Sequence, residues 1–142
     1  MSSGLQRAME KLIATFFTDN KIEKPFYKVG TIPPLKILSI SNALPKLNLA
    51  NEEIMLCYDR REMNQFKGFV LTDNFFNFIT DKPQTISILD VSKLIDEKAL
   101  TIILADEHKA LVKPLKELLD NISKGNFTQT TIKPNEEKQD VD

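Results

Sequence analysis

The sequence predicts an α+β fold in which a run of antiparallel strands lies between helices. Residues 53–88 contain several runs of β-branched, aromatic and aliphatic side chains separated by short polar segments, a pattern typical of consecutive antiparallel strands. Apolar residues at helical spacing occur in two segments before this stretch and in one after it. Together these observations predict two N-terminal helices, a meander of strands and a C-terminal helix that caps the sheet.

The first helix is predicted close to the N-terminus, with Ser2 or Ser3 as its cap. Five apolar residues fall at i, i+4, i+7, i+8 and i+11 and so form one stripe on a helix. The stripe could pack on its own chain or on another chain, and we expect the former because most amphipathic helices of small domains pack that way. Its members are Leu5, Met9, Leu12, Ile13 and Phe16.

Residues 19–31 are expected to form a connector that Phe26 and Tyr27 anchor to the core. A second helix should begin at Pro33 or Pro34, because a helix start does not need the missing N–H groups. It should end near residue 44, since Pro45 disfavours helical geometry in the residue before it. Its apolar residues at helical spacing are Ile37, Ile40, Leu44 and Leu47.

The strands follow in order. Ile54, Leu56 and Tyr58 should share one face of the first strand, and the segment Thr72-Asp73-Asn74 is a turn signal. Residues 84–88 are predicted to form a short strand, residues 89–94 a bend or single helical turn, and residues 99–105 a further buried strand followed by a polar hairpin turn at 106–109. The closing helix is predicted over residues 113–123, with Gly125 just beyond its end.

Composition narrows the possible functions. A chain of 142 residues with 42% hydrophobic residues fits one core, and a net charge of −1 with a pI of 5.9 disfavours nucleic-acid binding. One cysteine, no signal-peptide pattern and no long apolar run predict a cytoplasmic protein without a transmembrane segment. We expect residues 1–46 to be helical and packed on the body, residues 47–125 to form the main domain and residues 126–142 to be a disordered polar tail.

Three short motifs resemble those of small bacterial PH-like domains: EEIMLCYD at residues 52–59, KGFVLTDN at 67–74 and ISILDV at 86–91. The resemblance covers about residues 47–123. It implies a PH-like roll of antiparallel strands capped by a C-terminal helix, and a binding role. One position departs from the family pattern: Phe75 stands where a glycine is usual, so that Asn74 would have to take any positive φ that the turn requires.

A possible anion-binding site lies in the first strand loop of the expected roll. In that loop Arg60, Arg61 and Lys67 could pair with the phosphates of anionic lipid head groups. Asp59 and Glu62 flank the two arginines and cancel much of their field. A solvated loop, or a loop that contacts a protein, is therefore the preferred interpretation.

A possible partner-binding patch is formed by Phe75, Phe76 and Phe78. Alternate strand residues face opposite sides, so Phe76 and Phe78 should point one way and Phe75 the other. The core and an N-terminal helix could cover these two faces, which we prefer, or one face could stay open for a protein partner.

Nothing in the sequence indicates catalysis. Cys57 lies in an apolar strand and is expected to be a buried, inert thiol, and His108 is expected to be an exposed turn residue. We find no pair of catalytic acids, no phosphate-binding glycine loop and no convergent metal ligands, and so expect no cofactor and no metal.

The sequence therefore predicts a non-enzymatic interaction module that binds a protein through a sheet edge or an aromatic patch. An immunity protein or other inhibitor would fit its size. The alternative is a membrane-surface adaptor that binds anionic lipid through the loop carrying Arg60 and Arg61. The oligomeric state and the open sheet edge stay undetermined at this point.

Overall fold

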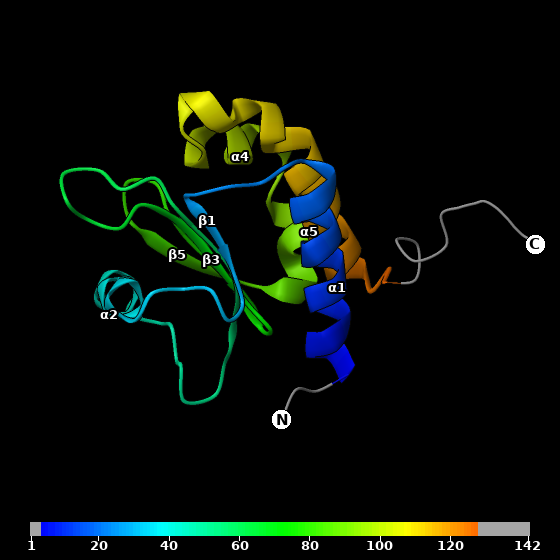
Figure 1. Cartoon of the computed structure of the whole chain (residues 1–142), viewed down its shortest axis with the longest axis horizontal. Coiled ribbons are helices and arrows are strands. Elements are labelled where there is room, and N and C mark those ends of the chain that lie inside the picture. Colours follow the sequence, from blue (N-terminus) through cyan, green and yellow to red (C-terminus); the bar gives the residue numbers. More distant parts are fainter. Residues whose placement is uncertain (1–3, 128–142) are drawn as a thin grey trace, which may run out of the picture.

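The fold is that of a computed structural model, which describes residues 4–127. A five-stranded sheet lies between one helix on one side and a group of helices on the other (Figure 1). The strands are β1 (Phe26–Lys28), β2 (Ile54–Asp59), β3 (Gly68–Thr72), β4 (Phe75–Ile79) and β5 (Pro83–Ser87). The helices are α1 (Gly4–Asp19), α2 (Pro34–Ala43), α3 (Val91–Leu94), α4 (Glu97–Ile103) and α5 (Val112–Lys124), with 3-10 helices η1 (Ile88–Asp90) and η2 (Asp106–Leu111).

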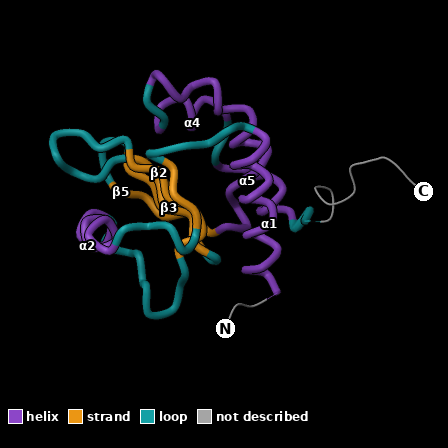
Figure 2. The backbone as a smooth tube through the Cα atoms, viewed as in Figure 1, coloured by secondary structure: helices purple, strands orange, loops and turns teal. Residues whose placement is uncertain are grey.

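All five strands are antiparallel and follow the order of the chain, β1-β2-β3-β4-β5. Figure 2 shows the strands between α2 on one side and α1 and α5 on the other. The predicted meander from β2 to β5 is confirmed, and the α+β class with it. Within residues 4–127 the sheet is open, since β1 and β5 each pair with a neighbour on one side only. Helix α5 lies beside α1 on one face of this sheet.

The larger core fills the space between the sheet and the helices α1 and α5. Met9, Leu12, Ile13 and Phe16 of α1 are buried in it, so the first helix packs on its own chain as expected. Leu5, at the start of α1, is exposed instead. The buried stripe of α5 is also confirmed: Leu115, Leu118, Leu119 and Ile122 face this core.

Aromatic rings run across the sheet on the side of this core. The ring centroids of Phe26 and Tyr58 are 4.5 Å apart, those of Tyr58 and Phe69 are 5.7 Å apart, and those of Phe69 and Phe76 are 5.2 Å apart. Aromatic pairs at this spacing add about 0.5–1.5 kcal/mol each beyond the area they bury. Four neighbouring strands are thus joined by side chains as well as by hydrogen bonds.

Helix α2 covers the opposite face and forms a smaller core there. Ile40 and Leu44 are buried in a cluster with Ile54, Cys57, Phe66 and Val70. The prediction that Ile54 shares a strand face with Leu56 and Tyr58 is therefore wrong, because the register of β2 shifts between Ile54 and Leu56. Because both faces are covered, every residue of β2 and β3 is buried.

The strand predicted over residues 99–105 is wrong, because this segment is mainly the helix α4. The Asp96 carboxylate caps it by accepting a hydrogen bond from the N–H of Ala99 at 2.9 Å. Leu100 and Ile103 are buried while Ile102 is exposed, which is helical rather than strand periodicity. The polar segment that follows is the 3-10 helix η2, not a hairpin turn.

The connector prediction is also wrong in one respect, since Phe26 and Tyr27 belong to the strand β1, which pairs with β2. The turn after β3 needs no positive φ at Asn74. Its backbone N–H donates instead to Oγ1 of Thr72, which also accepts from the N–H of Phe75. The special glycine is Gly68 (φ 134°), where a Cβ would lie 2.1 Å from the carbonyl oxygen of Tyr58.

The predicted polar tail, residues 126–142, lies outside the described residues from position 128 onwards. The preceding segment ends in the way that the sequence indicates. Gly125 takes a left-handed conformation (φ 74°) at the C-cap of α5, and its N–H donates to the carbonyl of Ile122.

Candidate functional site

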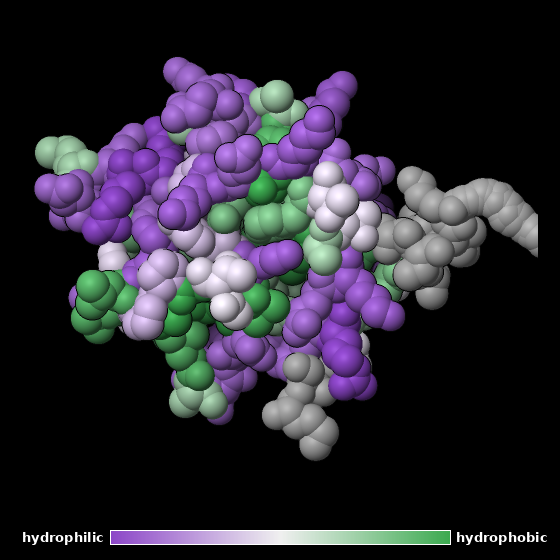
Figure 3. Space-filling model, in the orientation of Figure 1, coloured by the Kyte–Doolittle hydropathy of each residue, from purple (hydrophilic) through white to green (hydrophobic). Residues whose placement is uncertain are grey.

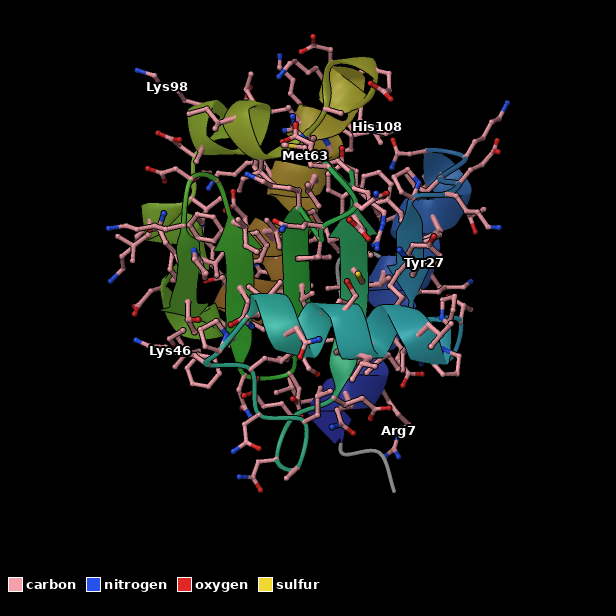
Figure 4. All side chains as sticks on the ribbon, turned by 90° about the vertical axis from the view of Figure 1, so that its left-hand side faces the viewer. Arg7, Tyr27, Lys46, Met63, Lys98 and His108 are labelled. Carbon is pink, nitrogen blue, oxygen red and sulfur yellow. The ribbon has the colours of Figure 1, made fainter. Side chains whose placement is uncertain are left out.

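The loop that carries Arg60, Arg61 and Lys67, the possible anion-binding site, connects β2 and β3 as a tight hairpin. Glu62 and Gln65 exchange backbone hydrogen bonds of 3.1 and 2.9 Å, which leaves Met63 and Asn64 as the two turn residues. Both have positive φ, 52° and 62°, as a type I′ turn requires. The Met63 side chain is 94% exposed at the tip (Figure 4). A bulky residue at this φ is unusual and costs about 1 kcal/mol or more.

Arg60 and Lys67 of this loop are already bound to oxygen atoms of the protein. The Arg60 guanidinium donates to the carbonyls of Ile102 and Ile103 and to Oε2 of Glu62, the last at 2.6 Å. Nζ of Lys67 donates to the carbonyl of Thr80 at 3.0 Å. These two cations tie the loop to α4 and to the turn after β4.

Arg61 contributes to a buried ion-pair cluster around Asp59. Nη1 of Arg61 lies 3.2 Å from Oδ2 of Asp59, and Nζ of Lys36 lies 2.7 Å from the same oxygen. Oδ1 of Asp59 accepts from the backbone N–H groups of Arg61 and Lys67. The carboxylate is fully buried and neutralises both cations, so the basic loop carries little free positive field.

The three phenylalanines do not form a surface patch. Phe76 and Phe78 point into the larger core and are buried, as expected for residues that share a strand face. Phe75 is half-buried. A partner cannot contact Phe76 or Phe78 in this fold, because the core encloses them.

An apolar surface lies instead on the outer side of α2. Leu35 is 81% exposed and Leu38 is 60% exposed. Figure 3 shows apolar residues gathered at the side of the molecule where α2 lies in Figure 1, and Figure 4 shows α2 lying across the strands. The spacing of apolar residues predicts only the inward stripe of this helix. A second signal in the sequence is that residues 33–45 are apolar or uncharged nearly all round, which is unusual for a helix with a solvent-facing side.

The single charge in residues 33–45 is that of Lys36, and it points inward. Its ammonium group binds Asp59 and lies 5.3 Å from the ring centroid of Tyr27. The outward side of α2 therefore presents Leu35 and Leu38 with no charge among them. Charged residues are depleted at the centres of protein interfaces, and this surface has that composition.

Two grooves flank the α2 surface. One, of about 480 Å³, runs between Ile37 and Leu49 and includes Glu52 and Glu53. The other, of about 430 Å³, lies between Ser39, Asn42 and Ala43 of α2 and the 64–67 segment. The helix thus forms a ridge between two depressions, a shape that a complementary protein surface can fit.

The reactive side chains are held in unreactive states. Burial, and secondarily the charge of Asp59, raises the pKa of the Cys57 thiol to about 12, so the thiol stays protonated, as expected for a buried cysteine. His108 is partly buried rather than fully exposed, and its Nδ1 lies 3.0 Å from the hydroxyl of Tyr58. That hydroxyl accepts from the N–H of Ala105 at 2.8 Å, and burial raises the pKa of Tyr58. The pair joins β2 to the segment between α4 and α5.

No group of three or more potential metal ligands occurs within residues 4–127. In the same part of the chain, no helix has the length and apolar character needed to cross a membrane. No family model, no curated protein and no solved structure matches the chain.

Proposed function

We propose that this protein is a non-enzymatic binding module of the bacterial cytoplasm that recognises another protein through the outer side of α2. The observation that carries the proposal is the uncharged ridge bearing Leu35 and Leu38, whose only charged residue is turned inward to Asp59. Exposing two leucines without a partner costs about 1.5–3 kcal/mol each relative to burying them. A protein partner that covers the ridge recovers this free energy.

The chemistry of the ridge and its grooves describes the partner. The contact should be apolar at its centre, to cover Leu35 and Leu38. At the side of the larger groove, where Glu52 and Glu53 lie, the partner should present lysine or arginine. The second groove accepts a side chain between α2 and the 64–67 segment.

The PH-like resemblance and the inhibitor role belong to the same proposal. The antiparallel run from β2 to β5 followed by the C-terminal helix α5 supports the resemblance. An immunity protein or other inhibitor would bind one partner tightly through a preformed surface, and a helix held rigidly by a buried ion pair suits that role. Sheet-edge binding, the other expected mode, concerns β5 and is a separate surface.

The test compares leucines of equal exposure. Leu38→Glu places a charge on the ridge, and Leu94→Glu places a charge outside α2. The two leucines are equally exposed, Leu38 at 60% and Leu94 at 61%. Both variants should keep the stability of the wild type, because both side chains are exposed. Partners captured from the native host and identified by mass spectrometry should be lost with Leu38→Glu and kept with Leu94→Glu. Equal capture by both variants would rule out the ridge as the contact.

The alternative function is binding of anionic lipid through the β2–β3 loop. The observation that favours it is the exposed Met63 side chain at the tip, next to the half-exposed guanidinium of Arg61. Against it, Asp59 and Glu62 neutralise the loop cations. Sedimentation with vesicles that contain phosphatidylserine tests this alternative. If the protein binds the vesicles and the double variant Arg60→Ala with Arg61→Ala does not, the protein binds lipid through this loop and is not a module that binds only proteins.

A further inference from the structure

The two edges of the sheet differ in whether their outward backbone groups are satisfied. In β1, alternate residues direct their backbone N–H and C=O groups toward β2. The N–H of Asp59 bonds to the carbonyl of Pro25, so the backbone groups of Phe26 and Lys28 point away from β2. The chain itself bonds to three of these four outward groups, all except the C=O of Phe26. Phe26 N–H donates to the carbonyl of Glu23, and the N–H and C=O of Lys28 both bond to Thr31. The β1 edge therefore has neither of its two outward N–H groups available for another strand.

The β5 edge is open. The N–H of Ile88 donates to the carbonyl of Asn74 at 2.9 Å, which fixes the alternation between β4 and β5. Gln84 and Ile86 then bond to β4, while the N–H and C=O groups of Thr85 and Ser87 point outward. Pro83 also faces outward, and it has no N–H to leave unpaired. No described residue bonds to these outward groups of Thr85 and Ser87.

This edge has little protection against pairing with another strand. Natural sheets protect free edges with lysines, inward charges, bulges or prolines. From Pro83 to Leu89 the chain has no charged residue, and β5 pairs with β4 without a bulge. Only Pro83 limits pairing, and it does so at one end of the strand.

The geometry points to a second copy of this chain as the partner of β5. A two-fold axis beside Ile86 places the two β5 strands antiparallel, with Thr85 of each copy opposite Ser87 of the other. Each such pair exchanges two hydrogen bonds, so that four bonds satisfy all four outward N–H groups of the dimer. The two five-stranded sheets become one continuous sheet.

The side chains favour this register over the one in which the two-fold axis lies beside Thr85. Ile86, which is half-buried, lies opposite Ile86 of the second copy, and Thr85 lies opposite Ser87, a favourable hydroxyl pair. Pro83 then lies opposite the exposed Leu89 of the second copy, and this register needs no N–H donor at position 83. An axis beside Thr85 would also form four bonds, but it leaves the Ser87 carbonyls unpaired and places the exposed Gln84 opposite Ile86.

The Ser87 backbone allows a matched pair of test variants. Its φ is −58°, which proline adopts without strain, and its N–H does not bond to β4. Ser87→Pro therefore removes the outward N–H, together with the hydroxyl that caps η1 through Leu89 N–H. Ser87→Ala removes the same hydroxyl but keeps the N–H. The difference between the two variants isolates the hydrogen bond to the second copy.

Sedimentation velocity over a concentration series should show reversible dimers of the wild type and of Ser87→Ala at the high concentrations used for NMR. A contact of one short strand per copy is smaller than the roughly 1,200–2,000 Å² of stable complexes, so weak association is expected. Ser87→Pro should raise the dissociation constant by about tenfold or more, since two of the four bonds are lost. A monomeric wild type, or equal association of both variants, would overturn the inference.

Amide exchange in the wild type gives a second readout that needs no variant. The amides of Gln84 and Ile86 should be protected at every concentration, because β4 holds them. The amides of Thr85 and Ser87 should become protected only as concentration rises. Protection of these two amides that is independent of concentration would instead place another segment of the same chain on the edge and would refute the second copy. Association that is lost in Leu38→Glu and kept in Ser87→Pro would move the contact to α2 and also refute it.

Discussion

Lys36 Nζ donates a hydrogen bond to Asp59 Oδ2 at 2.7 Å, and the Asp59 side chain is completely shielded from solvent. This contact joins α2 to the end of β2 and turns the only charge of the 33–45 segment away from solvent. The same carboxylate accepts from Arg61 and Lys67 N–H groups and so fixes the start of the β2–β3 loop. One buried carboxylate thereby positions both the outer side of α2 and the β2–β3 loop.

Asp59→Asn should lower the free energy of unfolding by about 3 kcal/mol, because it leaves the ammonium of Lys36 without its buried counterion. Urea unfolding followed by circular dichroism measures this change. Lys36→Met is the control: it keeps the apolar stem and leaves Asp59 paired with Arg61, so its loss should be smaller. Equal losses in the two variants would contradict the role given to Asp59.

Tyr58→Phe should destabilise the protein by about 2 kcal/mol, since it leaves the partly buried N–H of Ala105 without its acceptor. Thermal or urea unfolding checks the loss. Tyr27→Phe is the matched control, because Tyr27 is half-buried and its ring can still lie beneath Lys36, and it should change stability by less than about 0.5 kcal/mol. If Tyr58→Phe were as mild as the control, the hydroxyl would have no structural role.

Stability should fall at alkaline pH because of Cys57. Its pKa is raised from 9.0 to about 12 in the folded protein, so the unfolded thiol loses its proton first. The contribution is therefore complete below pH 9 and is lost as the pH rises from about 9 towards 12, by up to roughly 4 kcal/mol. Cys57→Val should show a flatter decline in urea unfolding over this range. An unchanged slope would mean that the thiol is not kept neutral by folding.

The β2–β3 hairpin should gain stability when its turn receives the residues that positive φ favours. Met63→Asn with Asn64→Gly should raise the free energy of unfolding by about 1 kcal/mol, because Asn-Gly suits a type I′ turn. Met63→Ala, which removes the exposed side chain and keeps the positive φ, should bring no gain. A gain of the same size from Met63→Ala would show that exposure of the side chain, and not backbone strain, determines the cost.

Local patterns were enough to predict the segments whose burial is one-sided. The stripes of α1 and α5 each depend on one face of a helix meeting one core, so the order of the residues shows the same periodicity as their burial. The run from Leu100 to Leu104 predicts a strand because β-branched residues suit a strand, but the Asp96 side chain caps this segment as a helix. The three residues of β1 were too few to give a period.

The binding surfaces depended on tertiary contacts. The sequence by itself determined that the chain builds an antiparallel sheet with covering helices and that no catalytic constellation is visible in it. Only the tertiary structure decided that the core encloses Phe76 and Phe78 and that Asp59 turns the charge of Lys36 away from the α2 surface. It also decided that Thr31 binds the outward groups of Lys28 at one edge of the sheet, while the β5 edge stays open. These outcomes depend on partners far apart in the chain, and residue spacing carries no information about which distant group will satisfy a charge or a backbone N–H.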